Sequence, residues 1–241
     1  MGLKPQGHDR QAAEGFCCGP VGEQGGRPLT REDPAPIVLA IAAVMEVQDR
    51  EVHGHLIRVA GYAVATGKRL RLSSKELEYI EQAALLHDVG KVGIATAILK
   101  KPGRLTEEEY EQVKQHPVLG EYIIRRIPAL VHLAPLVRSH HEWFNGRGYP
   151  DGLAGEAIPL GARIIAVADA FDAMTTDRPY RRAYTAEASA REIAACAGTQ
   201  FDPRVVKAFL EALAAPQGNP AGGPARSVLK VLLEREGVRL S

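Results

Sequence analysis

Residues able to bind a metal ion recur along the sequence singly or in pairs, and most are flanked by apolar residues. Glu51 and His55 are four residues apart, a spacing that puts both side chains on one face of a helix. Asp169 follows the apolar run 164–168, where an unpaired carboxylate would be costly. One such residue alone is usually a hydrogen-bonded core or surface residue, but eight together predict a multinuclear metal centre within a helical bundle. The eight candidate ligands are Glu51, His55, His87, Asp88, His116, His140, His141 and Asp169.

The types of these residues limit the metal that they could bind. Imidazole and carboxylate groups are present and no thiolate, a combination that favours manganese or iron and argues against a structural cysteine–zinc site. The three cysteines include an adjacent pair, Cys17 and Cys18, without ligand spacing, so we expect reduced thiols there.

The segment Leu85–Lys91 suggests what the metal would do. In a continuous helix, His87 and Asp88 project about 100° apart, and Lys91 follows within one turn on the same face. Two ligands beside a fixed cation suit phosphate chemistry, in which the lysine stabilises the negative charge of the transition state. The alternative is a solvated polar patch that interrupts a core helix. The other candidate ligands favour the metal site, and we predict Asp88 and Lys91 as catalytic residues.

The elements that must position these residues are helices. Apolar residues recur at helical spacing, capping residues precede several of these segments, and no β alternation of any length is present. We therefore predict one all-α domain at 34–215, a compact helical bundle, with a tail at 1–33 and a linker and short helix at 216–241. The expected helices are 34–47, 51–67, one that Ser73 or Ser74 caps and that leads into Leu85-Leu86, 106–116, 117–127, 130–141, 159–174 and two more that begin at Thr185 and Asp202.

A loop rich in glycine and proline separates two of these helices. Residues 142–159 contain four glycines and two prolines, which require special backbone geometry. A loop of this length within a compact domain is usually functional.

Composition excludes several classes of partner. The net charge of +1 gives no argument for a nucleic acid polymer or an anionic membrane as partner. Residues 1–30 contain no apolar core of a secretory signal, and the longest apolar run, 37–45, is too short to cross a bilayer. We expect a cytoplasmic protein in a reducing compartment.

The series of motifs resembles the HD-GYP domains, a branch of the HD hydrolase superfamily that hydrolyses cyclic di-GMP. The resemblance covers about 34–214 in the expected order. The matching stretches are His87-Asp88-Val89-Gly90-Lys91, His116-Pro117, His140-His141-Glu142, Gly148-Tyr149-Pro150, 167–174, Arg178-Pro179-Tyr180-Arg181 and Gln200-Phe201-Asp202-Pro203. The chain departs from the family around the loop, where Asn145 stands in place of an acidic residue, so loop contacts are expected to differ.

The resemblance implies an HD-type bundle with a metal centre in its core. The positions matching His87, Asp88, His116, His140, His141 and Asp169 would bind two ions. Members with a third ion add a carboxylate and a histidine from an earlier helix, for which Glu51 and His55 have the matching placement. The resemblance therefore implies two or three divalent ions, with Fe or Mn expected from the ligand types.

The resemblance also implies a reaction and its substrate. A hydroxide bridging two metal ions would attack phosphorus and open cyclic di-GMP to linear pGpG, with GMP as a further product. Arg178 and Arg181 would bind guanine or phosphate, and Asp172 would support a ligand or contact a base. Gly148, Tyr149 and Pro150 would shape a substrate rim or a docking edge for a diguanylate cyclase of the GGDEF type, and a homodimer is a further expectation.

Two alternatives stay open at this point. The chain could be an HD hydrolase that acts on another cyclic dinucleotide. It could also be a non-catalytic module that binds cyclic di-GMP or docks onto a protein, although the retention of every expected ligand favours an enzyme.

Overall fold

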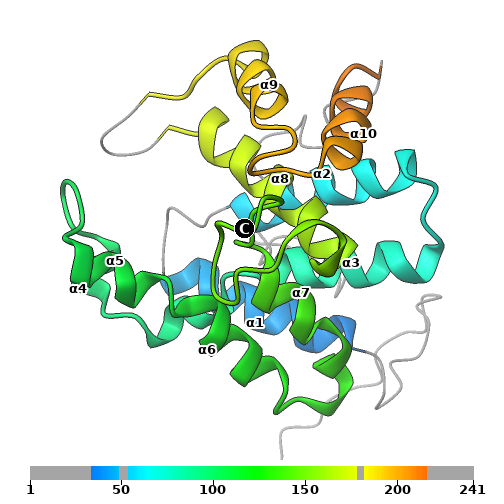
Figure 1. The fold of residues 1–241 in the computed structure, drawn as a ribbon. Coiled ribbons are helices and arrows are strands. Elements are labelled where there is room, and N and C mark those ends of the chain that lie inside the picture. Colours follow the sequence, from blue (N-terminus) through cyan, green and yellow to red (C-terminus); the bar gives the residue numbers. More distant parts are fainter. Residues whose placement is uncertain (1–33, 49–53, 178–181, 216–241) are drawn as a thin grey trace, which may run out of the picture. The chain divides into compact units, whose positions relative to one another are not determined.

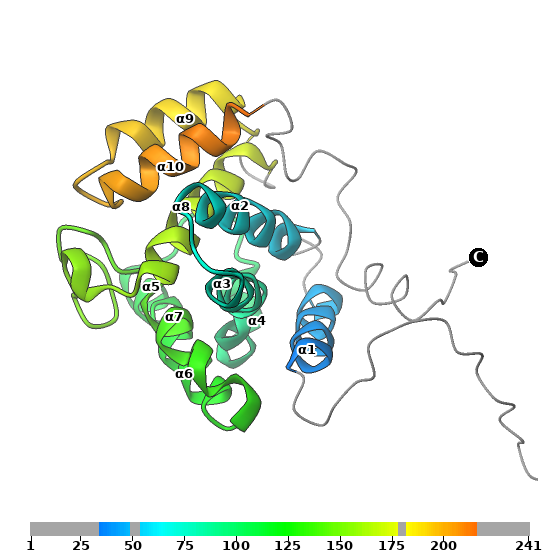
Figure 2. The ribbon, with the colours of Figure 1, turned by 90° about the vertical axis from the view of Figure 1, so that its right-hand side faces the viewer.

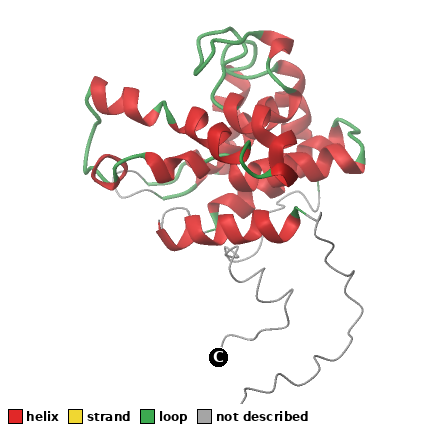
Figure 3. Ribbon diagram, turned by 90° about the horizontal axis from the view of Figure 1, so that it is seen from below, coloured by secondary structure: helices red, strands yellow, loops and turns green. Residues whose placement is uncertain are grey.

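A computed structural model of the chain describes residues 34–48, 54–177 and 182–215 (Figure 1). Within these ranges the chain forms α-helices and short 3-10 helices, and the view in Figure 3 shows no strand among them. The prediction of an all-α fold is confirmed. The predicted tail 1–33 and the segment 216–241 lie outside the described residues, so the domain boundaries stay a prediction.

The helices have the following bounds. The α-helices are α1 (Ala35–Gln48), α2 (His55–Arg69), α3 (Ser74–Leu86), α4 (Thr96–Leu99), α5 (Glu107–Val113), α6 (His116–Ile124), α7 (Ala134–Ser139), α8 (Leu160–Thr175), α9 (Ala186–Ala195) and α10 (Pro203–Leu213). The 3-10 helices are η2 (Val89–Gly93), η3 (Pro128–Leu133) and η4 (Gly155–Ala157).

Capping residues start the helices where the sequence predicts. Ser73 accepts a hydrogen bond from the Glu76 backbone N–H, and the Glu76 carboxylate accepts one in return from the Ser73 N–H. The same reciprocal capping box opens α5, and Thr185 caps α9. These side chains satisfy amide groups that a helix start leaves without partners.

Helix α3 lies at the centre of the packing. In Figure 2 it is seen nearly end-on, with α1, α2, α7 and α8 around it, and it contacts all four. Ile80, Ala83 and Leu86 on this helix are buried, and Leu56 of α2 and Ile165 of α8 are fully covered. Burial of each Leu or Ile side chain stabilises the fold by roughly 1.5–3 kcal/mol. The result is a rigid platform that ends directly before His87.

The continuous helix assumed for the shared face of His87, Asp88 and Lys91 is not observed. Helix α3 ends at Leu86, His87 is its C-cap, and Asp88 has φ −94° and ψ 5°, outside the helical region. The chain then tightens into η2, which packs against α6. Close approach explains the change, since a Cβ at Gly90 would lie 1.9 Å from the His116 carbonyl oxygen.

Other predicted boundaries shift by small amounts for local reasons. The segment expected as one helix at 130–141 is divided into η3 and α7, and Pro135 lies in the first turn of α7. Helix α2, expected at 51–67, begins at His55 and continues to Arg69. Among the described residues, no helix is both long and apolar enough to cross a membrane.

The contact at Gly90 generates a test of the fold. We expect Gly90→Ala to lower the free energy of unfolding by about 1–3 kcal/mol, because backbone atoms of α6 would have to move. Gly93→Ala in the same 3-10 helix is the matched control, since its Cβ would meet only the flexible end of Leu119, at 2.8 Å. Urea unfolding of both variants measures the difference, and equal losses would contradict the interpretation.

Candidate metal centre

Seven of the eight candidate ligands lie within the described residues, and the fold brings them together. His55 begins α2, His87 and Asp88 follow α3, and His116 begins α6. His140 and His141 follow α7, and Asp169 lies within α8. Ligand atoms lie within 4.8 Å of one another in three overlapping sets: His116, His140 and His141; His55, His87 and Asp169; and His87, Asp88 and His140. Glu51 lies outside the described residues.

The two carboxylates join the histidines into one cluster. Asp88 lies 3.5 Å from His87 Nε2 through Oδ2, and 3.3 Å from His116 Nε2 through Oδ1. Asp169 Oδ1 lies 3.5 Å from His55 Nε2 and 3.9 Å from His87 Nε2. His116 Nε2 and His140 Nε2 are 3.2 Å apart. Such spacings leave room for ions between the ligand atoms.

Three histidines are oriented by the backbone of the helix that precedes them. The Nδ1–H groups of His87, His116 and His140 donate to the carbonyls three residues earlier, at 2.7, 2.8 and 2.7 Å. This bond fixes the ring and its tautomer, as is usual for metal-ligating histidine, and leaves the lone pair of Nε2 facing the centre. His87 Nε2 is buried and has no hydrogen-bond partner. A buried acceptor without a partner is costly, and a bound cation would satisfy it.

His55 is oriented by side chains instead. Its Nδ1 lies 2.7 Å from Asp172 Oδ2, so Nε2 faces Asp169. The Asp172 side chain is 2% exposed, and its carboxylate also accepts hydrogen bonds from Arg58. Of the two roles expected for Asp172, this geometry supports the ligand-supporting role over a direct base contact.

Lys91 lies at the edge of the cluster. Its Nζ donates to Asp88 Oδ2 at 2.6 Å, and 38% of its side chain is exposed. The 3-10 geometry of η2 therefore keeps the lysine beside Asp88, as the i, i+3 spacing predicts. The ammonium group therefore contacts the buried Asp88 while part of the lysine side chain remains exposed to solvent.

Burial and the neighbouring charges together set the protonation states that metal binding requires. Burial would raise the pKa of Asp88, but Lys91 and the surrounding histidines hold that pKa well below its usual range. Burial and the neighbouring imidazoles lower the pKa of His140 well below its usual range, and burial lowers that of His141 to about 3. These imidazoles are therefore neutral and Asp88 is charged at neutral pH, as metal ligands must be.

The glycine-rich loop is fastened to the same cluster. Glu142 accepts hydrogen bonds from the backbone N–H groups of Asp151, at 2.7 Å, and Leu153, at 3.1 Å. A Cβ at Gly148 would lie 2.2 Å from the Trp143 nitrogen, so only glycine fits there. This close approach lets the Tyr149 ring stack on His141, with centroids 4.9 Å apart. Tyr149–Pro150 is a cis peptide bond.

Some expectations for the site lie beyond the described residues, and one side chain was not anticipated. Arg178 and Arg181 lie outside the described part of the chain. Arg58 was not expected to contribute, although it follows His55 by three residues and so shares a helix face with it. That spacing was the available signal.

Comparison with protein families places the chain. Residues 40–205 match the HD domain family. The chain belongs to the HD domain family. The resemblance to HD-GYP domains that the motifs indicate is confirmed.

Two relatives of the chain are named as cyclic di-GMP phosphodiesterases. The cyclic di-GMP phosphodiesterase response regulator RpfG of Xanthomonas campestris pv. campestris is 43% identical over 177 residues, which are 70% of this chain and 46% of that protein. A cyclic di-GMP phosphodiesterase of Thermotoga maritima is 42% identical over 168 residues, 69% of this chain and 46% of that protein. The chain thus spans slightly less than half the length of these two relatives.

A solved structure shares the fold of this HD domain. The crystal structure of a cyclic GMP-AMP specific phosphodiesterase of V. cholerae, V-cGAP3, aligns with a TM-score of 0.55 at 25% sequence identity. The alignment covers 76% of this chain and 51% of that chain. It supports the HD-type arrangement of helices around the His and Asp cluster.

The pKa of His141 generates a test of burial at the site. The unfolded chain has an ordinary histidine pKa of about 6.5. Between that value and about 3 the unfolded state alone binds the proton, so stability present above about 6.5 is lost as the pH falls. In chelator-treated protein, we expect this residue alone to cost about 2 kcal/mol at about pH 5.

Urea unfolding of the wild type and His141→Asn at about pH 7.5 and about pH 5 measures this cost, because the variant lacks the titrating ring. The loss of stability between the two pH values should be smaller in the variant. The same pH dependence in both proteins would show that His141 is accessible to protons in the folded state.

Proposed function

We propose that this chain is a metal-dependent phosphodiesterase that hydrolyses cyclic di-GMP to linear pGpG, and pGpG onward to GMP. The observation that carries the proposal is the largely buried cluster in which Nε2 of His55, His87 and His116 lies 3.3 to 3.9 Å from Asp88 or Asp169, with Lys91 beside it. The names of the two relatives described above support cyclic di-GMP as the substrate.

Seven described residues would hold the ions. They are His55, His87, Asp88, His116, His140, His141 and Asp169, with Glu51 as the expected additional ligand of a third ion. The mixed nitrogen and oxygen donors suit two or three ions of Fe or Mn. Bound ions would supply a water of lowered pKa as nucleophile and neutralise the charge of the phosphate.

The protein contributes fixed charge and orientation around the reacting phosphate. Lys91 places a cation at the open side of the cluster, where negative charge would grow on the phosphate oxygens. Because Lys91 also bonds Asp88, it keeps that carboxylate ionised and aimed at His87 and His116. Both residues would therefore act in catalysis, Asp88 as a ligand and Lys91 as an electrostatic stabiliser.

Residues around the cluster would bind the rest of the substrate. Arg178 and Arg181 are proposed to bind guanine or phosphate, because a guanidinium group presents paired donors to either. Gly148 and Pro150 shape the loop that holds Tyr149 over His141, so this loop would form one wall of the substrate site. The loop is also the proposed docking edge for a GGDEF-type diguanylate cyclase, and a homodimer is proposed as well.

A second candidate substrate has specific support. The solved structure described above is titled a cyclic GMP-AMP specific phosphodiesterase and shares the fold of this chain. Cyclic GMP-AMP has the same phosphodiester ring and would meet the same metal ligands. The two substrates differ only in one base, so contacts to the bases would decide between them.

Removal of one ligand tests the metal mechanism. We expect Asp88→Ala to abolish hydrolysis of cyclic di-GMP and to lower bound metal, because the carboxylate faces two histidines of the cluster. Lys101→Ala is the control, since its partner Glu109 lies on α5, outside the cluster. Product analysis, metal analysis and circular dichroism of both variants report the outcome. Unchanged turnover in Asp88→Ala would overturn the mechanism.

A substrate panel tests the choice of dinucleotide. We expect the wild type to hydrolyse cyclic di-GMP faster than cyclic GMP-AMP or linear dinucleotides at equal concentration, with pGpG as the first product. Chromatography of time points measures each rate. Faster turnover of cyclic GMP-AMP would replace the proposed substrate with the second candidate.

A further inference from the structure

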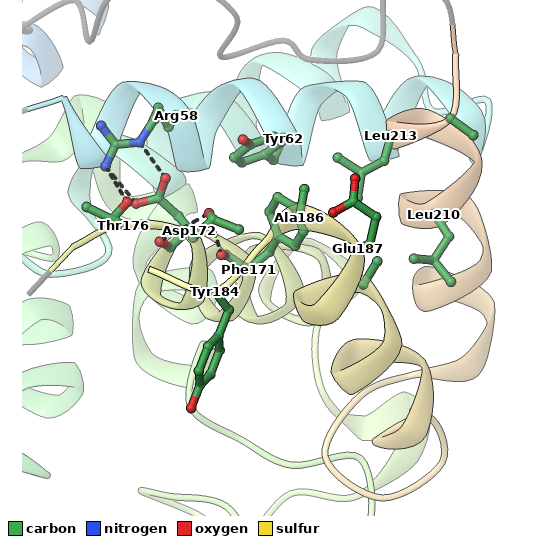
Figure 4. Close-up of a pocket in the computed structure, with 13 residues that line it drawn as sticks. Arg58, Tyr62, Phe171, Asp172, Thr176, Tyr184, Ala186, Glu187, Leu210 and Leu213 are labelled. Carbon is green, nitrogen blue, oxygen red and sulfur yellow. Dashed lines mark hydrogen bonds and ion pairs between the residues drawn. The ribbon is translucent and has the colours of Figure 1, made fainter. Parts of the chain in front are cut away.

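A cavity of about 610 Å³ lies behind the metal centre, between α2, α8, α9 and α10 (Figure 4). No candidate ligand lines it, but Arg58 and Asp172 do. Figure 4 shows the guanidinium group of Arg58 at one side of the cavity, where it bridges Asp172 and Thr176. Arg58 and Asp172, the side chains that hold His55 in place, therefore also line this cavity.

Arg58 holds the Asp172 carboxylate with paired hydrogen bonds. Its Nε donates to Oδ1 at 2.5 Å and its Nη2 donates to Oδ2 at 2.9 Å. Nη2 also donates to Thr176 Oγ1 at 3.1 Å, which fixes the plane of the guanidinium group. A planar guanidinium group that donates two hydrogen bonds to one carboxylate, here called the guanidinium fork, fixes the orientation of the carboxylate plane as well as its position.

The direction of the carboxylate determines the direction of the imidazole. Asp172 Oδ2 accepts both from Arg58 and from His55 Nδ1, at 2.7 Å. With Nδ1 held there, Nε2 of His55 lies 3.5 Å from Asp169 Oδ1. His55 differs in this from His87, His116 and His140, whose rings are held by backbone carbonyls. The orientation of His55 depends instead on the Asp172 side chain, which Arg58 in turn holds in place.

We propose that Arg58 is a positioning residue of the metal centre, which fixes the His55 imidazole through Asp172 and so determines the occupancy of the ion that His55 would bind. This inference rests on the metal centre proposed above. Outer partners of ligating histidines commonly change metal affinity about 10- to 100-fold when they are removed. Arg58 does not contact His55 directly but acts through Asp172. Among the described contacts of the Asp172 carboxylate, Arg58 is the one group besides His55 that donates hydrogen bonds to it.

The alternative is that Arg58 and Asp172 only fasten α2 to α8. The chain offers a matched control for this role, because Arg163 near the start of the same helix α8 pairs with Asp202, Nη1 to Oδ2, at 2.5 Å. Both arginine side chains are largely covered, with 17% of Arg58 and 12% of Arg163 exposed. Arg163 and Asp202 contact no candidate ligand in the described part of the chain.

The test compares Arg58→Ala, Arg58→Lys, Arg163→Ala and His55→Ala after anaerobic reconstitution with Mn²⁺. Metal per chain and the affinity for Mn²⁺ are measured, with circular dichroism as the check of folding. We expect Arg58→Ala to bind the ion of His55 about 10- to 100-fold more weakly. Lysine keeps the charge without the fork, so Arg58→Lys should stay folded and also lose affinity. Arg163→Ala should keep the Mn²⁺ affinity of the wild type.

The cavity allows a second measurement that a fastening role would not affect. Arg58→Ala would leave a space of guanidinium shape open to the cavity, so millimolar guanidinium should restore Mn²⁺ affinity in this variant, whereas equal NaCl should not. Guanidinium should not restore His55→Ala, which lacks the ligand itself.

Each outcome of this comparison decides something. Wild-type Mn²⁺ affinity in Arg58→Lys would overturn the role of the fork. If Arg58→Ala does not fold, the Mn²⁺ affinity of Arg58→Lys still tests the role of the guanidinium group. Equal metal loss in Arg58→Ala and Arg163→Ala, without guanidinium rescue, would show a fastening role only. Wild-type metal content in His55→Ala would overturn the proposed ligand set instead, which keeps the two failures distinguishable.

Discussion

The ends of three helices supply the interaction on which the site depends. The last turn of an α-helix leaves carbonyl groups without backbone donors. At the ends of α3, α5 and α7, one of these carbonyls accepts a hydrogen bond from the Nδ1–H of His87, His116 and His140, respectively. A single hydrogen bond thus satisfies one terminal carbonyl of each helix and orients each imidazole.

This arrangement requires very close packing of the backbone around the cluster. Gly90 brings η2 against the first turn of α6, and Gly148 brings the loop against His141 and Trp143. Neither position has room for a Cβ, so both glycines are required by contact. Glu142 then binds two backbone amides of the loop and prevents it from moving away. Short helices and one long loop are held around the cluster by these few contacts.

Sequence reasoning reached the helices, since these follow from residue type and local spacing. It reached the set of candidate ligands from residue type together with the resemblance to HD-GYP domains, and the structure brings seven of them together. Capping residues such as Ser73 and Thr106 determine helix starts within a few residues, and the structure agrees. Sequence reasoning failed at Leu85–Lys91, where the chain leaves the helix because of contact with α6, a segment far along the sequence. It also missed the Arg58–Asp172 pair, whose members are separated by 114 positions. Periodicity contains no information about such pairs.

The seven candidate ligands that the structure describes are dispersed from His55 to Asp169, on segments that only the folded chain brings together. An unfolded chain would therefore present isolated imidazoles and carboxylates of low affinity. An ion that binds the folded state alone stabilises it by mass action, in proportion to the logarithm of its free concentration. In the cell, the supply of divalent metal would then influence how much of this protein persists in the folded state.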